Sequence, residues 1–337
     1  MDGERTRADR QQLAGLLREA LGRHRQLSKV ERLRGGSKKG VYRATFDDDV
    51  SAIVYIWGAA EDYWSGSAAT ASRDRTDPLS HASGLDLFET AQARLDFLGV
   101  RTPRLYLADR SQEYYPADVA VVEDIPGPTL EDLLRDDPQR GRSAVVQVGQ
   151  ALDIMRGDKA PCFGKLQHVA SGGISAGDSC EQVVLERALR DLTEAEARDA
   201  RFGPRRNQIE QTLRQGATAA LPRCEYTLIH GELGPDHVLV DRQGNPVIID
   251  IEGLMYFDVE WEHVFLRLRF GRHYPLLPHA DLDQERVDFY RLAMHLSLVA
   301  GPLRLLDGDY PDRQEMLEII ECNALQVLAP YQRLAGA

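Results

Sequence analysis

The sequence predicts an α+β fold in which a strand-rich N-terminal part precedes a larger, mainly helical part. Short apolar runs typical of strands follow one another up to residue 57. Longer segments with apolar residues at helical spacing occupy residues 181–220 and 284–334. Runs of strands followed by runs of helices are typical of α+β folds. A chain of 337 residues is also long enough for a sizeable core and two lobes.

The composition indicates a globular protein of the cytoplasm and argues against two kinds of partner. Hydrophobic residues make up 43% of the chain, yet no apolar run approaches membrane-spanning length and no signal peptide is evident. The formal net charge of -12 disfavours nucleic acid, and it suits either a cationic substrate or simple solubility. The four cysteines lack CxxC spacing, which indicates reduced thiols. Nothing in the sequence indicates the oligomeric state.

The N-terminal elements begin with an amphipathic helix over residues 5–24. A glycine-rich loop within residues 33–45 lies between two predicted strands, and a third strand covers residues 52–57. Glycines in such a loop let backbone N–H groups approach phosphate oxygens, although glycine-rich turns are also common in ordinary hairpins. Residues 58–84 show no period, and we interpret them as an insertion that could act as a flap.

The remaining elements follow from hydrophobic period and capping signals. Thr129 and Asp132 form a capping pair at the start of one short helix. The other elements predicted in this way are helices at 85–98 and 143–156, two helices within 181–220 that break near Gly203 and Pro204, and closing helices at 284–306 and 313–334.

Ionisable groups gather around a predicted hairpin within residues 228–252. Residues 238–240 and 247–249 are apolar runs typical of buried strands, and the segment between them is dense in turn formers. We expect this hairpin to bring Glu232, His237 and Asp250 to one edge. Two carboxylates and an imidazole in one place suit proton abstraction and metal binding.

This stretch resembles the catalytic loop and metal-binding segment of aminoglycoside phosphotransferases, choline kinases and their relatives, which are small-molecule kinases. The resemblance implies that His230 braces the loop and that Glu232 orients or deprotonates a substrate hydroxyl. It implies that His237 and Asp250 hold Mg²⁺ against the nucleotide phosphates. Because a metal-binding imidazole must be neutral, activity is expected to fall below about pH 6.5.

The resemblance also implies a protein-kinase-like, two-lobed fold, with strands within residues 100–108 and 117–127. Its small N-lobe, with an antiparallel sheet, would cover residues 1–124, and its mostly helical C-lobe would cover residues 125–337. The nucleotide would be ATP or GTP, and its partner a small, cationic or antibiotic-like molecule with a hydroxyl group. The residues expected to bind the nucleotide are Gly36, Ser37, Lys38, Lys39 and Gly40 in the glycine-rich loop, and Glu123, Asp124 and Ile125 in the hinge between the lobes.

Two positions of the catalytic hairpin depart from the family pattern. Glu232 stands where the family has Asp, and the longer side chain shifts the carboxylate; a misplacement of about 1 Å can cost roughly a hundredfold in rate. His237 stands where the family has Asn, which resembles macrolide phosphotransferases. Asp258 and Glu262, further along the chain, match two acids that brace the catalytic loop in relatives.

The third predicted strand lacks the cation that pairs with the nucleotide phosphates in the family. Val54 and Tyr55 occupy the candidate places. Lys38 or Lys39 could supply the charge, or both could be solvated turn residues. Glu89, on the helix at 85–98, would be the partner of the phosphate-binding cation, with a surface charge as the alternative.

Three functions remain open at this stage. The first is an O-kinase for a small molecule. The second is a degenerate family member that binds a nucleotide or metabolite without transferring phosphate, which the missing strand lysine and Glu232 both motivate. The third is a different transfer reaction at the altered loop.

Overall fold

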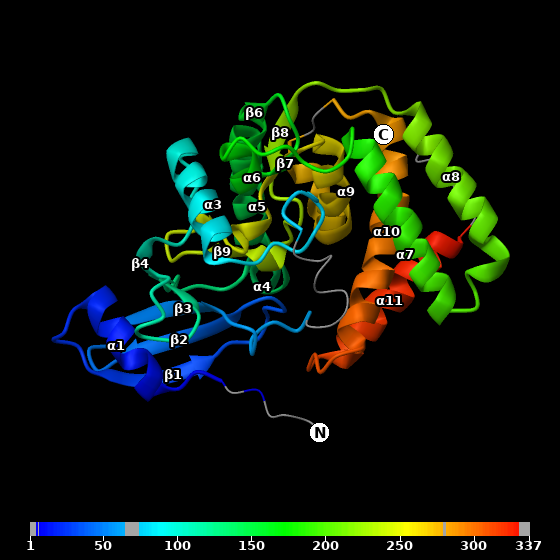
Figure 1. Cartoon of the computed structure of the whole chain (residues 1–337). Coiled ribbons are helices and arrows are strands. Elements are labelled where there is room, and N and C mark those ends of the chain that lie inside the picture. Colours follow the sequence, from blue (N-terminus) through cyan, green and yellow to red (C-terminus); the bar gives the residue numbers. More distant parts are fainter. Residues whose placement is uncertain (1–4, 6, 65–73, 279–280, 330–337) are drawn as a thin grey trace. The chain divides into compact units, whose positions relative to one another are not determined.

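The computed structural model describes residues 5, 7–64, 74–278 and 281–329 (Figure 1). The chain divides into two compact units. The first unit comprises residues 1–70, 81–144 and 236–252, and the second comprises residues 71–80, 145–235 and 253–337. The lobe boundary expected after residue 124 stays a prediction.

A five-stranded antiparallel sheet forms the base of the first unit, in the order β1-β2-β3-β5-β4. Its strands are β1 (Leu27–Arg32), β2 (Gly40–Phe46), β3 (Ser51–Trp57), β4 (Leu105–Asp109) and β5 (Asp118–Glu123). The register pairs Gly40 with Ile56 and Ala52 with Glu123. The strand content predicted for the N-terminal part is thereby confirmed.

One helix packs on each face of this sheet. Figure 1 shows α1 (Arg10–Leu21) against the first strands, and α3 (Leu85–Leu98) contacts β5. Because successive strand residues point to opposite faces, Val54 joins the core under α1, whereas Tyr55 contacts Phe88 of α3 with ring centroids 5.5 Å apart. The core under α1 also contains Leu13, Leu16, Leu17, Tyr42, Phe46, Ile56, Val119 and Val121.

The predicted hairpin forms as expected and belongs to the first unit. Strands β9 (Val238–Val240) and β10 (Pro246–Ile248) pair antiparallel. The backbone N–H of Val240 donates to the Pro128 carbonyl at 3.0 Å. Next to this contact, a Cβ on Gly127 would lie 1.9 Å from the Val240 carbonyl oxygen. Glycine therefore permits the hairpin to join the segment that leads into helix α4 (Leu130–Asp136).

The second unit contains a small sheet that the sequence did not predict. Its strands are β6 (Lys159–Ala160), β7 (Gly164–Lys165), β8 (Tyr226–Ile229) and β11 (Met255–Phe257), in the order β6-β8-β11-β7. Strands of two to four residues are too short to show an alternating pattern. Their pairing depends on partners far along the chain.

Helices make up most of the second unit, as predicted. In Figure 1, α10 lies beside both α7 and α11. The predicted break near residue 203 is a short 3-10 helix, Gly203–Arg205, between α7 and α8. The helices are α6 (Leu166–Ala170), α7 (Cys180–Arg198), α8 (Arg206–Ala219), α9 (Val259–Phe270), α10 (Gln284–Leu306) and α11 (Arg313–Leu328), and they follow α5 (Pro138–Gly157) along the chain.

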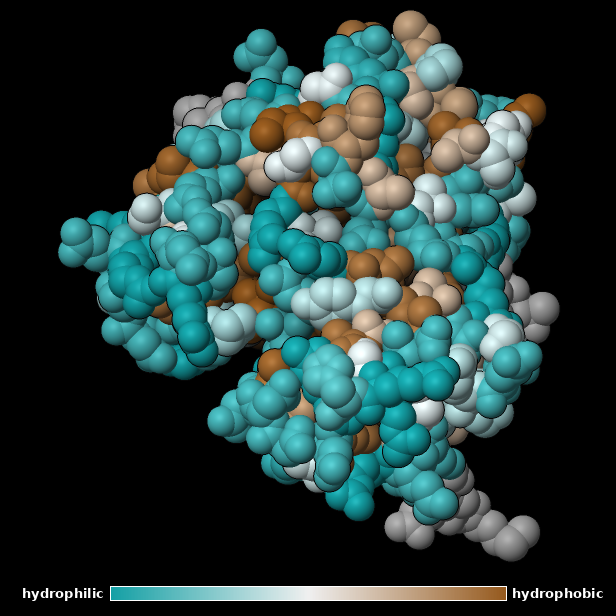
Figure 2. Space-filling view, turned by 90° about the vertical axis from the view of Figure 1, so that its left-hand side faces the viewer, coloured by the Kyte–Doolittle hydropathy of each residue, from teal (hydrophilic) through white to brown (hydrophobic). Residues whose placement is uncertain are grey.

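Two sequence predictions fall partly outside the described residues. These are residues 65–73 of the insertion and residues 330–334 of the last predicted helix. Among the described residues, no helix is long and apolar enough to cross a membrane. The face shown in Figure 2 is mostly hydrophilic, with hydrophobic side chains in scattered patches.

Candidate functional site

The glycine-rich loop connects β1 to β2 and carries Lys39 at its end. Gly35 and Gly36 have positive φ values of 91° and 77°, a conformation that favours glycine. A Cβ on Gly36 would also lie 2.6 Å from the Lys39 carbonyl oxygen. The loop therefore folds back tightly just before Lys39.

The side chain of Lys39 is buried and paired, with 6% of its surface exposed. Its Nζ donates to Asp250 Oδ1 at 2.9 Å and to Glu252 Oε1, and it lies 4.8 Å from the centroid of the Tyr55 ring. Tyr55 occupies the place on β3 where relatives were expected to carry the cation. Of the two lysines considered from the sequence, Lys39 thus brings a positive charge to this part of the first unit.

Electrostatics hold this cluster in its charged form. Burial alone would lower the pKa of Lys39, but the carboxylates of Asp250 and Glu252 outweigh it and raise that pKa above its usual value. Burial likewise opposes ionisation of Asp250, yet Lys39 and then His237 bring its pKa below the usual range. The cluster is therefore an ammonium group set against carboxylates at neutral pH.

Asp250 follows β10 in a left-handed conformation, with a φ of 59°. Its Oδ2 lies 3.9 Å from His237 Nε2, and the Ile249 N–H donates to the His237 carbonyl at 3.0 Å. Asp tolerates this conformation better than most residues. The hairpin brings His237 and Asp250 together in the first unit, whereas Glu232 belongs to the second unit.

The donor atoms near Asp250 fit a hard divalent cation that is held in part by a nucleotide. Within the residues that the structure describes, no group of three or more His, Cys, Asp or Glu side chains could hold a metal ion. Mg²⁺, however, is commonly bound by one or two carboxylates together with water and phosphate oxygens. Glu252 Oε2 is buried and has no hydrogen-bond partner in the described chain. Oxygen donors from Asp250 and Glu252 suit Mg²⁺ better than the His237 imidazole does.

Glu252 was not among the residues singled out from the sequence. The available signal was a second acid two positions after Asp250, at the end of an apolar strand. In the structure the two acids follow the strand: Asp250 has a φ of 59° and Glu252 lies in the 3-10 turn Ile251–Gly253, and this turn brings both carboxylates to Lys39.

The hinge residues are held by arginines at their side chains. Glu123 accepts from Arg101 at 3.0 Å, and Asp124 accepts two bonds from Arg43, at 2.7 and 3.1 Å. Ile125 is buried. These pairs fix the end of β5.

Glu89 on α3 does not pair with Lys39. Its Oε2 accepts from Arg110 instead. Val54 and Tyr55 stand at the two places on β3 where the cation was expected, and Glu89 forms a partly exposed ion pair at the surface instead.

The second unit contains His230 and Glu232 on the loop that follows β8. His230 is buried, whereas Glu232 is exposed. Gly231 has a φ of 83°, and its N–H donates to Glu262 Oε2 at 2.6 Å. Burial raises the pKa of Glu262 to about 7, against the opposing effect of the backbone N–H groups of Gly231 and His230. Glu262, on α9, thus ties the loop to the helix beneath it.

Asp258, the other acid expected to brace this loop, bonds elsewhere. It accepts from Arg286 and, at 2.6 Å, from the Tyr290 hydroxyl. Both partners lie on α10, so Asp258 ties the start of α9 to α10.

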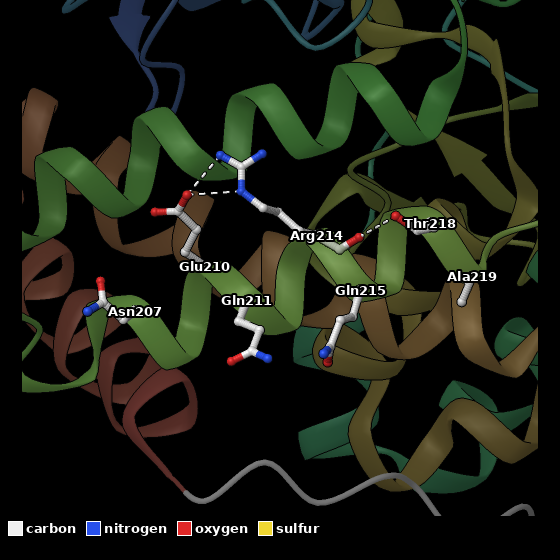
Figure 3. A pocket seen from close by; sticks show the side chains of 7 residues that line it. All are labelled: Asn207, Glu210, Gln211, Arg214, Gln215, Thr218 and Ala219. Carbon is white, nitrogen blue, oxygen red and sulfur yellow. Dashed lines mark hydrogen bonds and ion pairs between the residues drawn. The ribbon is translucent and has the colours of Figure 1, made fainter.

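One pocket lined by described residues has a volume of about 660 Å³ and shares no residue with these sites. Figure 3 shows its lining side chains along one face of α8, where Glu210 and Arg214 pair at 2.8 Å. Its lining residues are Asn207, Glu210, Gln211, Arg214, Gln215, Thr218 and Ala219. They recur at helical spacing on a single helix, which is typical of an exposed polar face rather than of an active site.

A model of the phosphotransferase enzyme family (APH) matches residues 72–296, which is more than half of the chain. Among curated proteins, none matches this chain. The family match covers the hairpin of β9 and β10 and the helices on both sides of it.

Solved structures, two of them of antibiotic phosphotransferases, share the fold at low sequence identity. The GDP complex of aminoglycoside 2'-phosphotransferase-IIIa has a TM-score of 0.63 at 16% identity, covering 96% of this chain and 100% of that one. Spectinomycin phosphotransferase with ADP and spectinomycin has a TM-score of 0.59 at 13% identity, covering 98% and 100%. LicA in complex with AMP has a TM-score of 0.58 at 15% identity, covering 96% and 97%. These likenesses confirm the predicted kinase-like fold.

Proposed function

We propose, because the chain belongs to the phosphotransferase enzyme family, that it transfers the γ-phosphate of ATP or GTP to a hydroxyl of a small molecule. The hydroxyl oxygen would attack the γ-phosphorus, and the bond from that phosphorus to the β–γ bridging oxygen would break. The nucleoside diphosphate leaves, and the hydroxyl proton passes to a carboxylate. Catalysis of such a transfer is mostly positioning and neutralisation of charge.

The observation that carries this proposal is the cluster around Lys39. Its ammonium group meets Asp250 Oδ1 at 2.9 Å, with Glu252 as its second partner. We propose that Lys39 replaces the missing strand cation and binds the nucleotide phosphates together with the backbone of Gly36, Ser37, Lys38 and Gly40. In this proposal Glu123, Asp124 and Ile125 border the base.

We assign the remaining roles by the same reasoning. Asp250 and His237 would hold a divalent cation together with water and the nucleotide phosphates, and the buried Glu252 carboxylate would add negative charge beside them. Mg²⁺ supplies positive charge to the phosphate oxygens when it is bound. Glu232 would accept the proton of the substrate hydroxyl, and His230 would keep its loop in place.

The acceptor we propose is a small hydroxylated molecule, cationic or antibiotic-like. The net charge of -12 attracts cations over long range. Relatives of the same fold bind hygromycin B and spectinomycin. We place the reaction in the cytoplasm, which supplies nucleoside triphosphates and where thiols stay reduced; the cysteines are free in the structure.

Calorimetric titration with Mg-ATP and Mg-GTP, followed by a nucleoside diphosphate release assay over a panel of hydroxylated amines, tests the proposal. Loss of hydrogen bonds to a charged group predicts that Lys39→Met weakens nucleotide binding about 10- to 100-fold. The neighbouring Lys38→Met is the matched control and should have a smaller effect. Glu232→Ala should lower kcat about 100- to 10,000-fold while nucleotide binding stays unchanged.

A second candidate is a protein that binds nucleotide without transferring phosphate. The observation that favours it is Glu232, since the family was expected to carry Asp at this position. Nucleotide binding without turnover on any compound, together with no effect of Glu232→Ala, would support this candidate and contradict the kinase. Unchanged nucleotide affinity in Lys39→Met would contradict the role of Lys39.

A further inference from the structure

The glycine-rich loop is held from outside by the two described ends of the insertion. Trp64 Nε1 donates to Ser37 Oγ, and the Tyr63 N–H donates to the Ser37 carbonyl, both at 2.9 Å. From the other end, Ser83 Oγ donates to the Lys38 carbonyl at 3.0 Å. These contacts lie within the first unit.

The two ends of the insertion also contact each other. The rings of Trp64 and His81 have centroids 3.7 Å apart at an interplanar angle of 43°. We call Tyr63, Trp64, His81 and Ser83 the loop clamp. It bonds the two residues that directly precede Lys39.

Lys39 is also held on its C-terminal side. A Cβ on Gly40 would lie 2.5 Å from Glu61 Cδ, so the backbone runs directly against this side chain. Glu61 is itself buried and accepts from Arg32 at 3.1 Å and from the Tyr42 hydroxyl. The loop therefore contacts fixed groups on both sides of Lys39.

The position of Lys39 explains why such support matters. A cation on a central strand is fixed by the backbone ladder, whereas a cation beside Gly35 and Gly36 shares the freedom of a glycine-rich loop. Ordering a residue costs roughly 1–2 kcal/mol of backbone entropy. Hydrogen bonds from outside the loop can order it before the nucleotide arrives. Binding then loses less free energy to the ordering of the loop.

We propose that the loop clamp positions Lys39 for the nucleotide phosphates, with Trp64 and Ser83 as positioning residues. The nucleotide part of this inference rests on the proposed kinase function. The positioning of Lys39 against Asp250 and Glu252 does not, because it exists in the protein without ligand.

The first measurement is amine-reactive labelling of Lys39 in the nucleotide-free protein, followed by mass spectrometry. Trp64→Phe keeps an aromatic ring beside His81 but removes the N–H donor. It should raise the labelling rate of Lys39 about three- to tenfold, as expected for loss of one hydrogen bond. Ser83→Ala should act in the same direction, and Ser83→Thr, which keeps the hydroxyl, should restore slow labelling.

The chain offers a matched control in Trp57→Phe. The Nε1 of Trp57 is buried and has no hydrogen-bond partner within the described residues, so the same substitution removes no bond there. Lys39 labelling in Trp57→Phe should equal that of the wild type. Thermal unfolding of each variant separates local release of the loop from general unfolding.

The second measurement is nucleotide kinetics. Trp64→Phe should raise KM for the nucleotide about three- to tenfold and change kcat at saturating nucleotide much less. Faster Lys39 labelling in Trp64→Phe and Ser83→Ala, but not in Trp57→Phe, supports the clamp even if the protein binds no nucleotide. A failure to bind any nucleotide would overturn the proposed kinase function and leave the clamp supported. Equal labelling in all these proteins overturns the clamp, whatever the nucleotide does.

Discussion

At the scale of single residues, buried ionisable groups decide the chemistry of both units. Lys39 is surrounded by carboxylates, so its charge is stabilised inside the first unit. Glu262 has no cation within hydrogen-bonding distance among the described residues. Only backbone N–H groups counteract the rise in its pKa that burial causes. The same physical effect, removal of water, therefore leaves one group charged and drives the other toward its neutral form.

The pKa of Glu262 predicts how stability depends on pH. Its folded-state pKa of about 7 lies above the usual value of 4.5 for a Glu side chain, so the folded protein favours the protonated carboxyl. The contribution of Glu262 to the free energy of unfolding is greatest below pH 4.5, falls as pH rises to about 7, and then stays low. The total change is about 3 kcal/mol.

Urea unfolding at several pH values tests this expectation against Glu262→Gln. The amide keeps an acceptor for the Gly231 N–H but does not titrate, so the variant should gain stability relative to the wild type as pH rises. The exposed Glu113→Gln serves as control. A stability difference between wild type and Glu262→Gln that stays constant from pH 4.5 to 7 would exclude this titration.

At the scale of elements, the catalytic hairpin depends on close backbone contacts. Strands β9 and β10 have only three residues each, too few to be stable alone. Their attachment runs through Val240, Leu239 and Ile248, which contact residues near the end of β5 and the start of α4. The geometry around Asp250 follows from this attachment.

Gly127→Ala should disturb the attachment directly. The added methyl would lie 1.9 Å from the Val240 carbonyl oxygen, which forces the two segments apart. Overpacking of this kind costs about 1–3 kcal/mol, and nucleotide affinity should fall with it because Asp250 shifts. Chemical unfolding and calorimetry measure both effects.

Gly157→Ala is the matched control. A Cβ at this position, the last of α5, meets nothing within 4 Å. Because Ala restricts the unfolded chain more than Gly, this change should be neutral or slightly stabilising. If both alanine variants behave alike, the close approach at Gly127 is not what holds the hairpin.

At the scale of the whole molecule, each unit has its own sheet and its own buried ionic cluster. In the second unit Arg286 lies 1% exposed on α10 and pairs with Glu181 of α7 and with Asp258 at the start of α9. This one side chain joins three helices. Such a cluster matters for stability mainly because removing its cation would leave buried carboxylates with an uncompensated charge.

Arg286→Met should therefore destabilise the protein by about 3–5 kcal/mol, since it leaves the buried Glu181 without its cation and Asp258 with only the cation of Arg223, at 3.4 Å. Arg135→Met is the control, because Arg135 pairs with Asp132 and Asp136 at the surface and should matter by about 0–1 kcal/mol. Urea unfolding followed by circular dichroism measures both. Similar losses in the two variants would contradict the importance of burial.

Local pattern was sufficient for many elements. The helices at Leu85–Leu98 and Gln284–Leu306 have the bounds predicted, because hydrophobic period, turn residues and caps are properties of neighbouring residues. The hairpin was predicted from the same kind of signal, whereas the family and the kinase-like fold were predicted from the resemblance of the catalytic stretch to known small-molecule kinases. The four-stranded sheet of the second unit was not, since its short strands exist only through their pairing.

The sequence alone determined that a cation was missing from the third strand and that two lysines could replace it. Lys38 and Lys39 are adjacent residues of the same type in the same loop, so the sequence does not distinguish between them. The tertiary structure distinguishes their surroundings, because Lys39 meets Asp250 across 211 positions of sequence, and on this contact we propose Lys39 as the phosphate-binding cation. Such a choice depends on how the loop is folded and on what the hairpin brings near, and neither is encoded in the neighbouring residues.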